Sequence, residues 1–121
     1  MKLVIDRKTW IRGEDSGASC LLRSSDGKKC CLGFYALACG LHENQIREKP
    51  APANLSNTGI KQWNDTMYRS IPTDAYQTLK HSSIAQHLML INDEVCFSSE
   101  EEREQKIKEL FARIGVEVEF K

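Results

Sequence analysis

The sequence predicts an α+β domain in which about three helices cover one face of a small antiparallel sheet. Three observations support this prediction. The chain opens with the apolar stretch Lys2–Ile5 and closes with Val116–Phe120, where apolar and acidic residues alternate with the period of a half-buried strand. An Asp-Gly pair separates two further apolar runs near the start, as in a hairpin. Three longer stretches carry apolar residues in patterns that suit helices.

Size and composition fit one domain. The chain has 121 residues, of which 40% are hydrophobic and 28% are charged, which is ordinary for a protein with a single core. No stretch has the composition of a linker between domains. Residues 1–121 are therefore expected to form one domain.

A short helix is expected directly after the first strand. Asp6 is placed to cap this helix, which would run through residues 9–12 and end at Gly13.

The expected hairpin has its arms at residues 19–23 and 28–31. Gly27 of the Asp-Gly pair can adopt the positive φ that a tight turn needs. The second arm leads into residues 32–39, which are almost wholly apolar or small and are followed by Gly40, a common residue at helix C-caps. This stretch predicts a buried helix at the centre of the core.

The segment from about 41 to 71 is expected to be a long irregular crossover. Pro50 and Pro52 exclude regular helix around them, because proline lacks an amide hydrogen and restricts the residue before it. Residues 55–68 leave two alternatives open, a strand or a short helix around Trp63.

An amphipathic helix is expected after Ser82 or Ser83, either of which can act as its N-cap. Its apolar face is formed by Ile84, Ala85, Leu88 and Ile91. A second amphipathic helix follows.

Two capping boxes are possible for that second helix. Ser98 can pair with Glu101, or Ser99 with Glu102, and Gly115 would end the helix before the last strand.

Charge and cysteine content narrow the classes of function. Seventeen Lys and Arg residues balance seventeen Asp and Glu residues, so no overall field favours nucleic acid or an anionic membrane. The opening residues do not resemble a secretory signal, and no stretch approaches the ~20 apolar residues of a membrane span. Five cysteines are an odd number, which suits reduced thiols in a cytoplasm better than a disulfide framework.

Cys30 and Cys31 are adjacent at the expected junction between strand and helix. In a cysteine-dependent enzyme, Cys31 would be the nucleophile, with its thiolate favoured by the helix N-terminus and by Lys28 and Lys29. Asp93 would then orient a catalytic group or hold a ligand. The favoured alternative is that both thiols are small core residues, because cysteine is among the most buried residue types.

No metal and no other cofactor is expected. The cysteines include no Cys-x-x-Cys pair, and adjacent cysteines rarely bind one tetrahedral ion. Nothing in the spacing connects His42, His81 or His87 with Cys31, so all three are expected at the surface.

Asn92 and Asp93 follow Ile91 at the expected end of the first amphipathic helix. Asparagine tolerates the left-handed conformation, and Asx side chains bond to their own backbone in turns. The pair is therefore expected to terminate the helix rather than to carry chemistry.

The order of these motifs resembles a widespread family of small proteins of uncharacterised function, encoded by phages, prophages and some bacteria. Its members share a Cys-Cys-Leu-Gly motif and a later Leu-x-x-x-Asn-Asp motif. The resemblance implies a phage or mobile-element setting and no particular activity. Phe34-Tyr35-Ala36 departs from the usual Val-Leu-Cys after the glycine. The family-motif residues, expected to be structural, are Trp10, Gly27, Cys30, Cys31, Leu32, Gly33, Asn92 and Asp93.

The leading hypothesis is a non-catalytic accessory protein, encoded by a phage or mobile element, that binds a host or phage macromolecule in the host cytoplasm. A protein partner is preferred, and a membrane is not expected. The alternatives are a small cysteine-dependent enzyme using Cys31 and a nucleic-acid-associated module, the latter disfavoured by the zero net charge.

Overall fold

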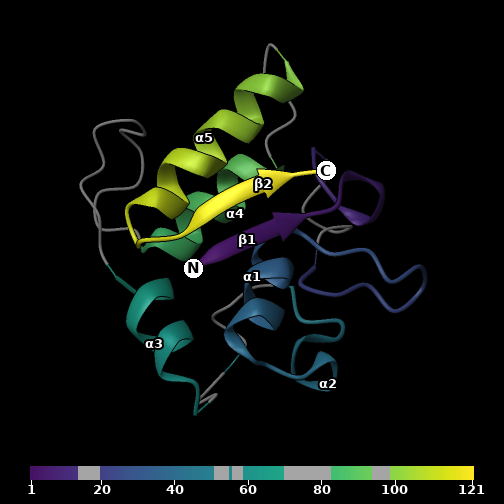
Figure 1. Ribbon diagram of the computed structural model, residues 1–121. Helices are drawn as coiled ribbons and strands as arrows, with labels where there is room; N and C mark the ends of the chain where they lie inside the picture. The colour runs from purple at the N-terminus through teal and green to yellow at the C-terminus, as the bar shows by residue number, and fades with distance from the viewer. Residues whose placement is uncertain (14–19, 51–54, 56–58, 70–82, 94–98) are drawn as a thin grey trace.

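The computed structural model describes residues 1–13, 20–50, 55, 59–69, 83–93 and 99–121. These residues form helices packed around a two-stranded sheet, which is an α+β arrangement (Figure 1). The elements in chain order are β1 (Lys2–Ile5), a 3₁₀ turn (Arg7–Thr9), α1 (Cys31–Cys39), α2 (Glu43–Ile46), α3 (Lys61–Met67), α4 (Ile84–Asp93), α5 (Glu100–Ala112) and β2 (Glu117–Phe120).

The two strands pair in parallel, so the expected antiparallel sheet is wrong. Lys2 lies opposite Glu117 and Ile5 lies opposite Phe120. The strands themselves are confirmed, with every second residue buried in each. Alternating burial is the same in parallel and antiparallel strands, so it does not predict the direction of pairing. A parallel pair needs a long connection between its strands, and here the segment that contains the helices supplies it.

The expected hairpin does not form, although its turn does. Gly27 has a φ of 74°, and its N–H donates to the Arg23 carbonyl at 2.8 Å. The second arm pairs elsewhere: Lys29 forms a parallel bridge with Trp10, while Leu22 of the first arm bridges Arg47. Two backbone hydrogen bonds do join the arms, from the Arg23 N–H to the Lys28 carbonyl at 2.8 Å and from the Cys30 N–H to the Cys20 carbonyl at 3.2 Å. Each arm also bridges a different neighbour, and the arms form no pair of strands.

The first short helix is also shorter than expected. The Asp6 side chain accepts a hydrogen bond from the Lys8 N–H at 2.9 Å, but only a 3₁₀ turn follows. The chain is extended at Trp10, because the Ile11 N–H donates to the Lys29 carbonyl at 2.8 Å instead of continuing a helix.

Helix α1 is confirmed as a buried helix. Gly40 ends it with a φ of 103°, and its N–H bonds back to the last turn. The helix contacts both β1 and α4. Leu32, Tyr35 and Ala36 on α1 are fully buried, so this helix lies at the centre of the core.

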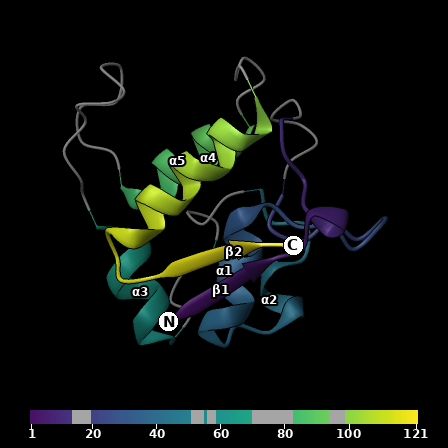
Figure 2. The same ribbon diagram turned by 45° about the horizontal axis from the view of Figure 1, so that its top comes forward.

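Helices α4 and α5 are also confirmed and pack side by side over the sheet (Figure 2). Ser83 accepts a hydrogen bond from the Gln86 N–H at 3.2 Å, and Ser99 accepts one from the Glu102 N–H at 3.2 Å. Of the alternative caps, Ser82 and Ser98 lie outside the described residues.

The expected irregular crossover contains two short helices, α2 and α3. Helix α3 forms around Trp63, which is fully buried and stacks on Tyr35 with ring centroids 5.9 Å apart. The Tyr35 hydroxyl hydrogen-bonds Thr66 Oγ1 at 2.9 Å, so α3 is fixed to α1 by both apolar and polar contacts.

Candidate functional site

The motif residues Trp10, Cys31 and Asn92 meet around one buried side-chain amide. Asn92 Oδ1 accepts hydrogen bonds from Trp10 Nε1 at 2.8 Å and from the Cys31 backbone N–H at 3.0 Å. Asn92 Nδ2 donates to the Ile11 carbonyl at 2.9 Å and to Asp93 Oδ1 at 3.0 Å. A primary amide offers two acceptor positions and two donors, so Asn92 uses its full capacity.

Asn92 caps α1 from a different helix. Cys30 is the N-cap of α1, but its side chain makes no capping hydrogen bond. The Cys31 N–H is one of the amides that a first helical turn leaves without an internal acceptor. Asn92 Oδ1 accepts from it, and so performs across the fold what an asparagine N-cap performs locally.

Asn92 and Asp93 stand at the end of α4 as expected, but Asn92 does not adopt the left-handed conformation. Asn92 lies within α4, and Glu48 is the only described residue other than glycine with a positive φ. Asn92 is fully buried, and its side chain bonds to distant segments rather than only to its own turn.

Arg103 of α5 contacts the backbone of α4 at Asn92. Its side chain is 3% exposed, and its Nη1 donates to the carbonyls of Ile91 and Asn92, each at 2.8 Å. These carbonyls belong to the last turn of α4, where the helix dipole favours a cation. We refer to Trp10, Cys31, Asn92 and Arg103 as the Asn92 cluster.

Glu100 and Arg12 connect the Asn92 cluster to the surface. Glu100 Oε2 lies 3.1 Å from the Nε atoms of both Arg12 and Arg103. The Arg12 guanidinium lies 4.6 Å from the centroid of the Trp10 ring. A β-carbon on Gly13 would lie 3.0 Å from Arg103 Nη2, so a larger residue there would press on the buried arginine.

The two adjacent thiols are sealed in the core. Cys31 is 0% exposed and Cys30 is 4% exposed. Burial raises the pKa of Cys30 to about 12 and the pKa of Cys31 well above its ordinary value. Cys31 Sγ lies 3.9 Å from the Leu88 carbonyl, to which it donates. A nucleophilic cysteine needs a lowered pKa and access to substrate, and Cys31 has neither.

The rest of the Cys-Cys-Leu-Gly motif is set by packing. A β-carbon on Gly33 would lie 1.8 Å from the Leu21 carbonyl oxygen, so only glycine fits between α1 and that backbone. Leu32 is fully buried. Gly27 differs, because no described atom lies within 4 Å of its β-carbon position and only its φ of 74° favours glycine.

The histidines belong to other parts of the fold. His42 caps α2, since its Nδ1 accepts from the Asn44 N–H at 3.1 Å. His87 is 2% exposed, so its expected position at the surface is wrong. Burial lowers the pKa of His87, and the positive charge of Arg113 lowers it further. His81 lies outside the described residues.

Cysteine, histidine and acidic side chains form no metal site in the ranges that the structure describes, where no three of them come together. Cys20, Cys30, Cys31 and Cys39 are free thiols, and Cys96 lies outside the described residues. No helix in the described part of the chain is both long enough and apolar enough to cross a membrane.

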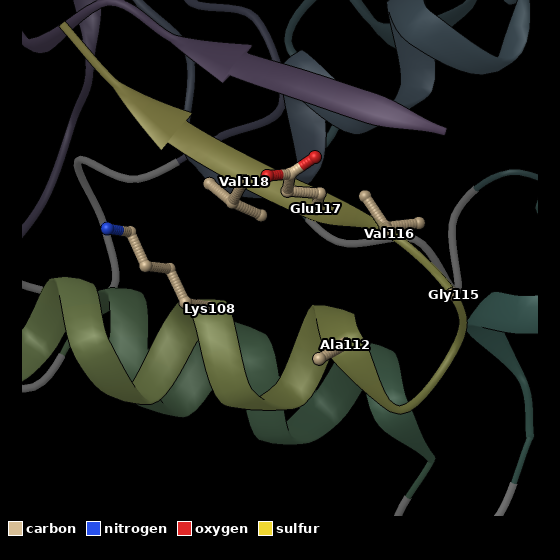
Figure 3. Close-up of a pocket in the computed structure, with 6 residues that line it drawn as sticks. All are labelled: Lys108, Ala112, Gly115, Val116, Glu117 and Val118. Atoms are coloured by element: carbon tan, nitrogen blue, oxygen red, sulfur yellow. The ribbon is translucent and has the colours of Figure 1, made fainter.

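A groove opens between α5 and β2 (Figure 3). Lys108 and Ala112 of α5 line one wall, residues 115–118 line the other, and the volume is about 500 Å³. Figure 3 shows β1 on the opposite side of β2 from α5, so the groove follows the open edge of the sheet. No sequence pattern predicts this groove, because it exists only through the placement of α5 beside β2.

Comparisons with protein-family models, with curated proteins and with solved structures find no match for this chain.

Proposed function

We propose that this chain is a non-catalytic accessory protein that binds another protein. The setting proposed with it, from the resemblance of its motifs, is a phage or mobile element and the cytoplasm of the host. The single observation that carries the proposal is that the polar and thiol groups of the motifs are buried in contacts that hold the fold, while an open groove lies along the sheet edge.

The Asn92 cluster supports a structural role for the motif residues. Every donor and acceptor of the Asn92 amide bonds to the protein, and the Nη1 group of Arg103 bonds to two α4 carbonyls. Groups that are used in this way are not available to bind substrate. Burial of this kind instead fixes the relative positions of β1, α1, α4 and α5.

The buried thiols argue against the cysteine-dependent enzyme. At neutral pH, groups with the pKa values of Cys30 and Cys31 remain protonated. In the described residues, the hydrogen-bond partner of Cys31 Sγ is a backbone carbonyl, not a base that could remove its proton. A nucleic-acid module is disfavoured by the zero net charge.

The test asks whether the chain forms a complex with another protein and whether that complex depends on the Cys31 thiol. Tagged protein would be expressed in host cells, and proteins that co-purify would be identified by mass spectrometry and then remixed as purified components. We expect a stoichiometric complex that survives Cys31→Ala when that variant remains folded. Loss of the complex or of biological effect in a folded Cys31→Ala variant would instead support thiol chemistry.

A further inference from the structure

One edge of β2 has backbone groups that the sheet does not use. The Glu117 N–H donates to the Met1 carbonyl and the Lys121 N–H donates to the Ile5 carbonyl, each at 2.9 Å. Successive residues of a strand direct their backbone groups to opposite edges. Those of Val118 and Phe120 therefore point away from β1. The Phe120 carbonyl accepts from Arg7 Nη1 at 3.4 Å, whereas no described residue accepts a hydrogen bond from the Val118 N–H.

The groove beside this edge has apolar side chains in its floor, although polar groups line it as well. Val116 is 2% exposed and Val118 is 7% exposed, and the small side chain of Ala112 stands on the facing helix. The groove is open to solvent, and Figure 3 shows the residues that line it. An extended chain could therefore place apolar side chains toward this floor while its backbone pairs with the strand edge.

The outward face of β2 is acidic. Glu117 is exposed and Glu119 is partly exposed, with the buried Val118 between them. On β1, which already pairs with β2, the basic residue Lys2 forms an ion pair with this face: Lys2 Nζ lies 3.3 Å from Glu119 Oε2. Lys108 stands on the helix side of the groove and would repel a basic residue that faces it. Basic residues of a bound strand therefore suit only the positions on the outward face.

This charge pattern disfavours a second copy of the same strand. Antiparallel pairing with Val118 opposite its counterpart would place Glu117 of one copy opposite Glu119 of the other. Like charges directly opposite each other destabilise a strand pair. A short, charged edge also protects a sheet from joining itself.

We propose that β2 binds an extended segment of a partner protein as a third strand, in which basic residues alternate with apolar ones. The basic residues lie opposite Glu117 and Glu119, and the apolar residues face the groove. Backbone hydrogen bonds to Val118 provide affinity, and the alternation provides specificity. This inference rests on the proposed binding function and names the chemistry of its partner.

The probe is a dye-labelled eight-residue peptide that alternates lysine and valine. Three further peptides serve as controls: one with four lysines followed by four valines, one that alternates glutamate and valine, and one with a central N-methylated valine. We expect saturable binding of the first peptide, measured by fluorescence anisotropy, and binding at least about tenfold weaker for each control. Equal binding of the alternating and block peptides would overturn the proposal.

Two matched variants locate the site. Glu117→Lys should weaken binding of the lysine-valine peptide about fivefold, because one attraction is replaced by one repulsion. Glu109→Lys makes the same change of charge on α5 outside the residues that line the groove, and should weaken binding less than about twofold. Equal losses in the two variants would show general charge attraction and would overturn the proposal. Melting curves establish that both variants are folded.

Amide exchange reports the backbone contact directly. The Val118 N–H should exchange more slowly in the peptide complex, and unchanged exchange there would overturn strand addition. A purified protein partner that binds Glu117→Lys as tightly as it binds the unchanged chain would overturn the docking site while leaving the binding function in place. Absence of any partner for the whole chain would count against the proposed function, whatever the peptides do.

Discussion

Asn92 Oδ1 and Trp10 Nε1 lie 2.8 Å apart and join two residues that are 82 positions apart in the chain. Both groups are buried, so neither can exchange this bond for one to bulk water. The same oxygen accepts from the first amide of α1. One side chain thus ties the segment after β1 and the start of α1 to the end of α4.

Asn92→Ala should lower the free energy of unfolding by about 3–5 kcal/mol. The change leaves the Trp10 indole, the Cys31 amide and the Ile11 carbonyl buried without their partner, and each such loss costs about 1–3 kcal/mol before relaxation. Urea unfolding monitored by tryptophan fluorescence measures the effect. Asp93→Asn is the control and should cost less than ~1 kcal/mol, because an amide oxygen can still accept from Asn92 Nδ2. Equal losses in the two variants would contradict this assignment.

Gly33→Ala should be far more destabilising than Gly27→Ala. The new β-carbon at position 33 would overlap the Leu21 carbonyl oxygen, so α1 or that backbone must move. We expect a loss above ~3 kcal/mol, in the range of severe core overpacking. Gly27→Ala meets no described atom and should cost only about 1–2 kcal/mol, for the left-handed backbone. Melting midpoints of the two variants decide, and similar midpoints would mean that α1 does not approach Leu21 so closely.

Replacement of Arg103 by methionine should cost about 2–4 kcal/mol. Two carbonyls at the end of α4 lose a charged donor, although the aliphatic part of the side chain is replaced. Lys61→Met removes an exposed pair with Asp65 and should cost less than ~1 kcal/mol. Chemical denaturation of both variants provides the comparison; a loss for Lys61→Met as large as that for Arg103→Met would speak against a special role of the buried arginine.

Thiol-reactive probes should modify Cys39 at least about tenfold faster than Cys30 and Cys31 in the folded protein. Burial raises the pKa of all three thiols, to about 12 for Cys30 and well above the ordinary value for Cys31, but Cys39 is only half-buried whereas the other two are sealed. Mass spectrometry of digested samples assigns each modification to its cysteine. Denatured protein supplies the reference, and in it the three thiols should react at similar rates. Fast labelling of Cys31 in native protein would reopen the enzyme hypothesis.

Stability should fall as the pH decreases below about 6.5 because of His87. Burial lowers the pKa of His87 in the folded protein from its ordinary value of 6.5, so the unfolded chain binds the proton more readily. Its contribution is therefore fully present above 6.5 and is lost as the pH falls toward the folded value. Urea midpoints at pH 7.5 and 5.5 measure the change, which should be smaller in His87→Gln. An equal pH dependence in this variant would assign the effect to other groups.

The helices and strands with clear periodicity could be predicted from the sequence, but the way in which the strands pair could not. The caps Ser83 and Ser99 act within one helical turn, so their signals are local. The direction of β2 relative to β1 has no local signal, because alternation of buried residues is the same in both. The Asp26-Gly27 turn formed as expected, but distant segments pair with its arms.

The motif residues were recognisable as unusual, but their contacts were not. Asn92 at a helix end has the local features of a turn residue, and only the fold brings Trp10 and Cys31 to its amide. Arg103 resembles any charged residue of an amphipathic helix until α5 is placed against α4. Gly33 is required by the carbonyl of Leu21, which no spacing rule connects with it.

The parallel pairing of β1 with β2 also joins two segments that lie far apart in the sequence. During translation Lys2–Ile5 is made long before its strand partner Glu117–Phe120. Closing a loop of this length is slow, while contacts within and between neighbouring helices form quickly. We therefore expect the helices to collapse first in the nascent chain and the sheet to complete folding only after synthesis of β2.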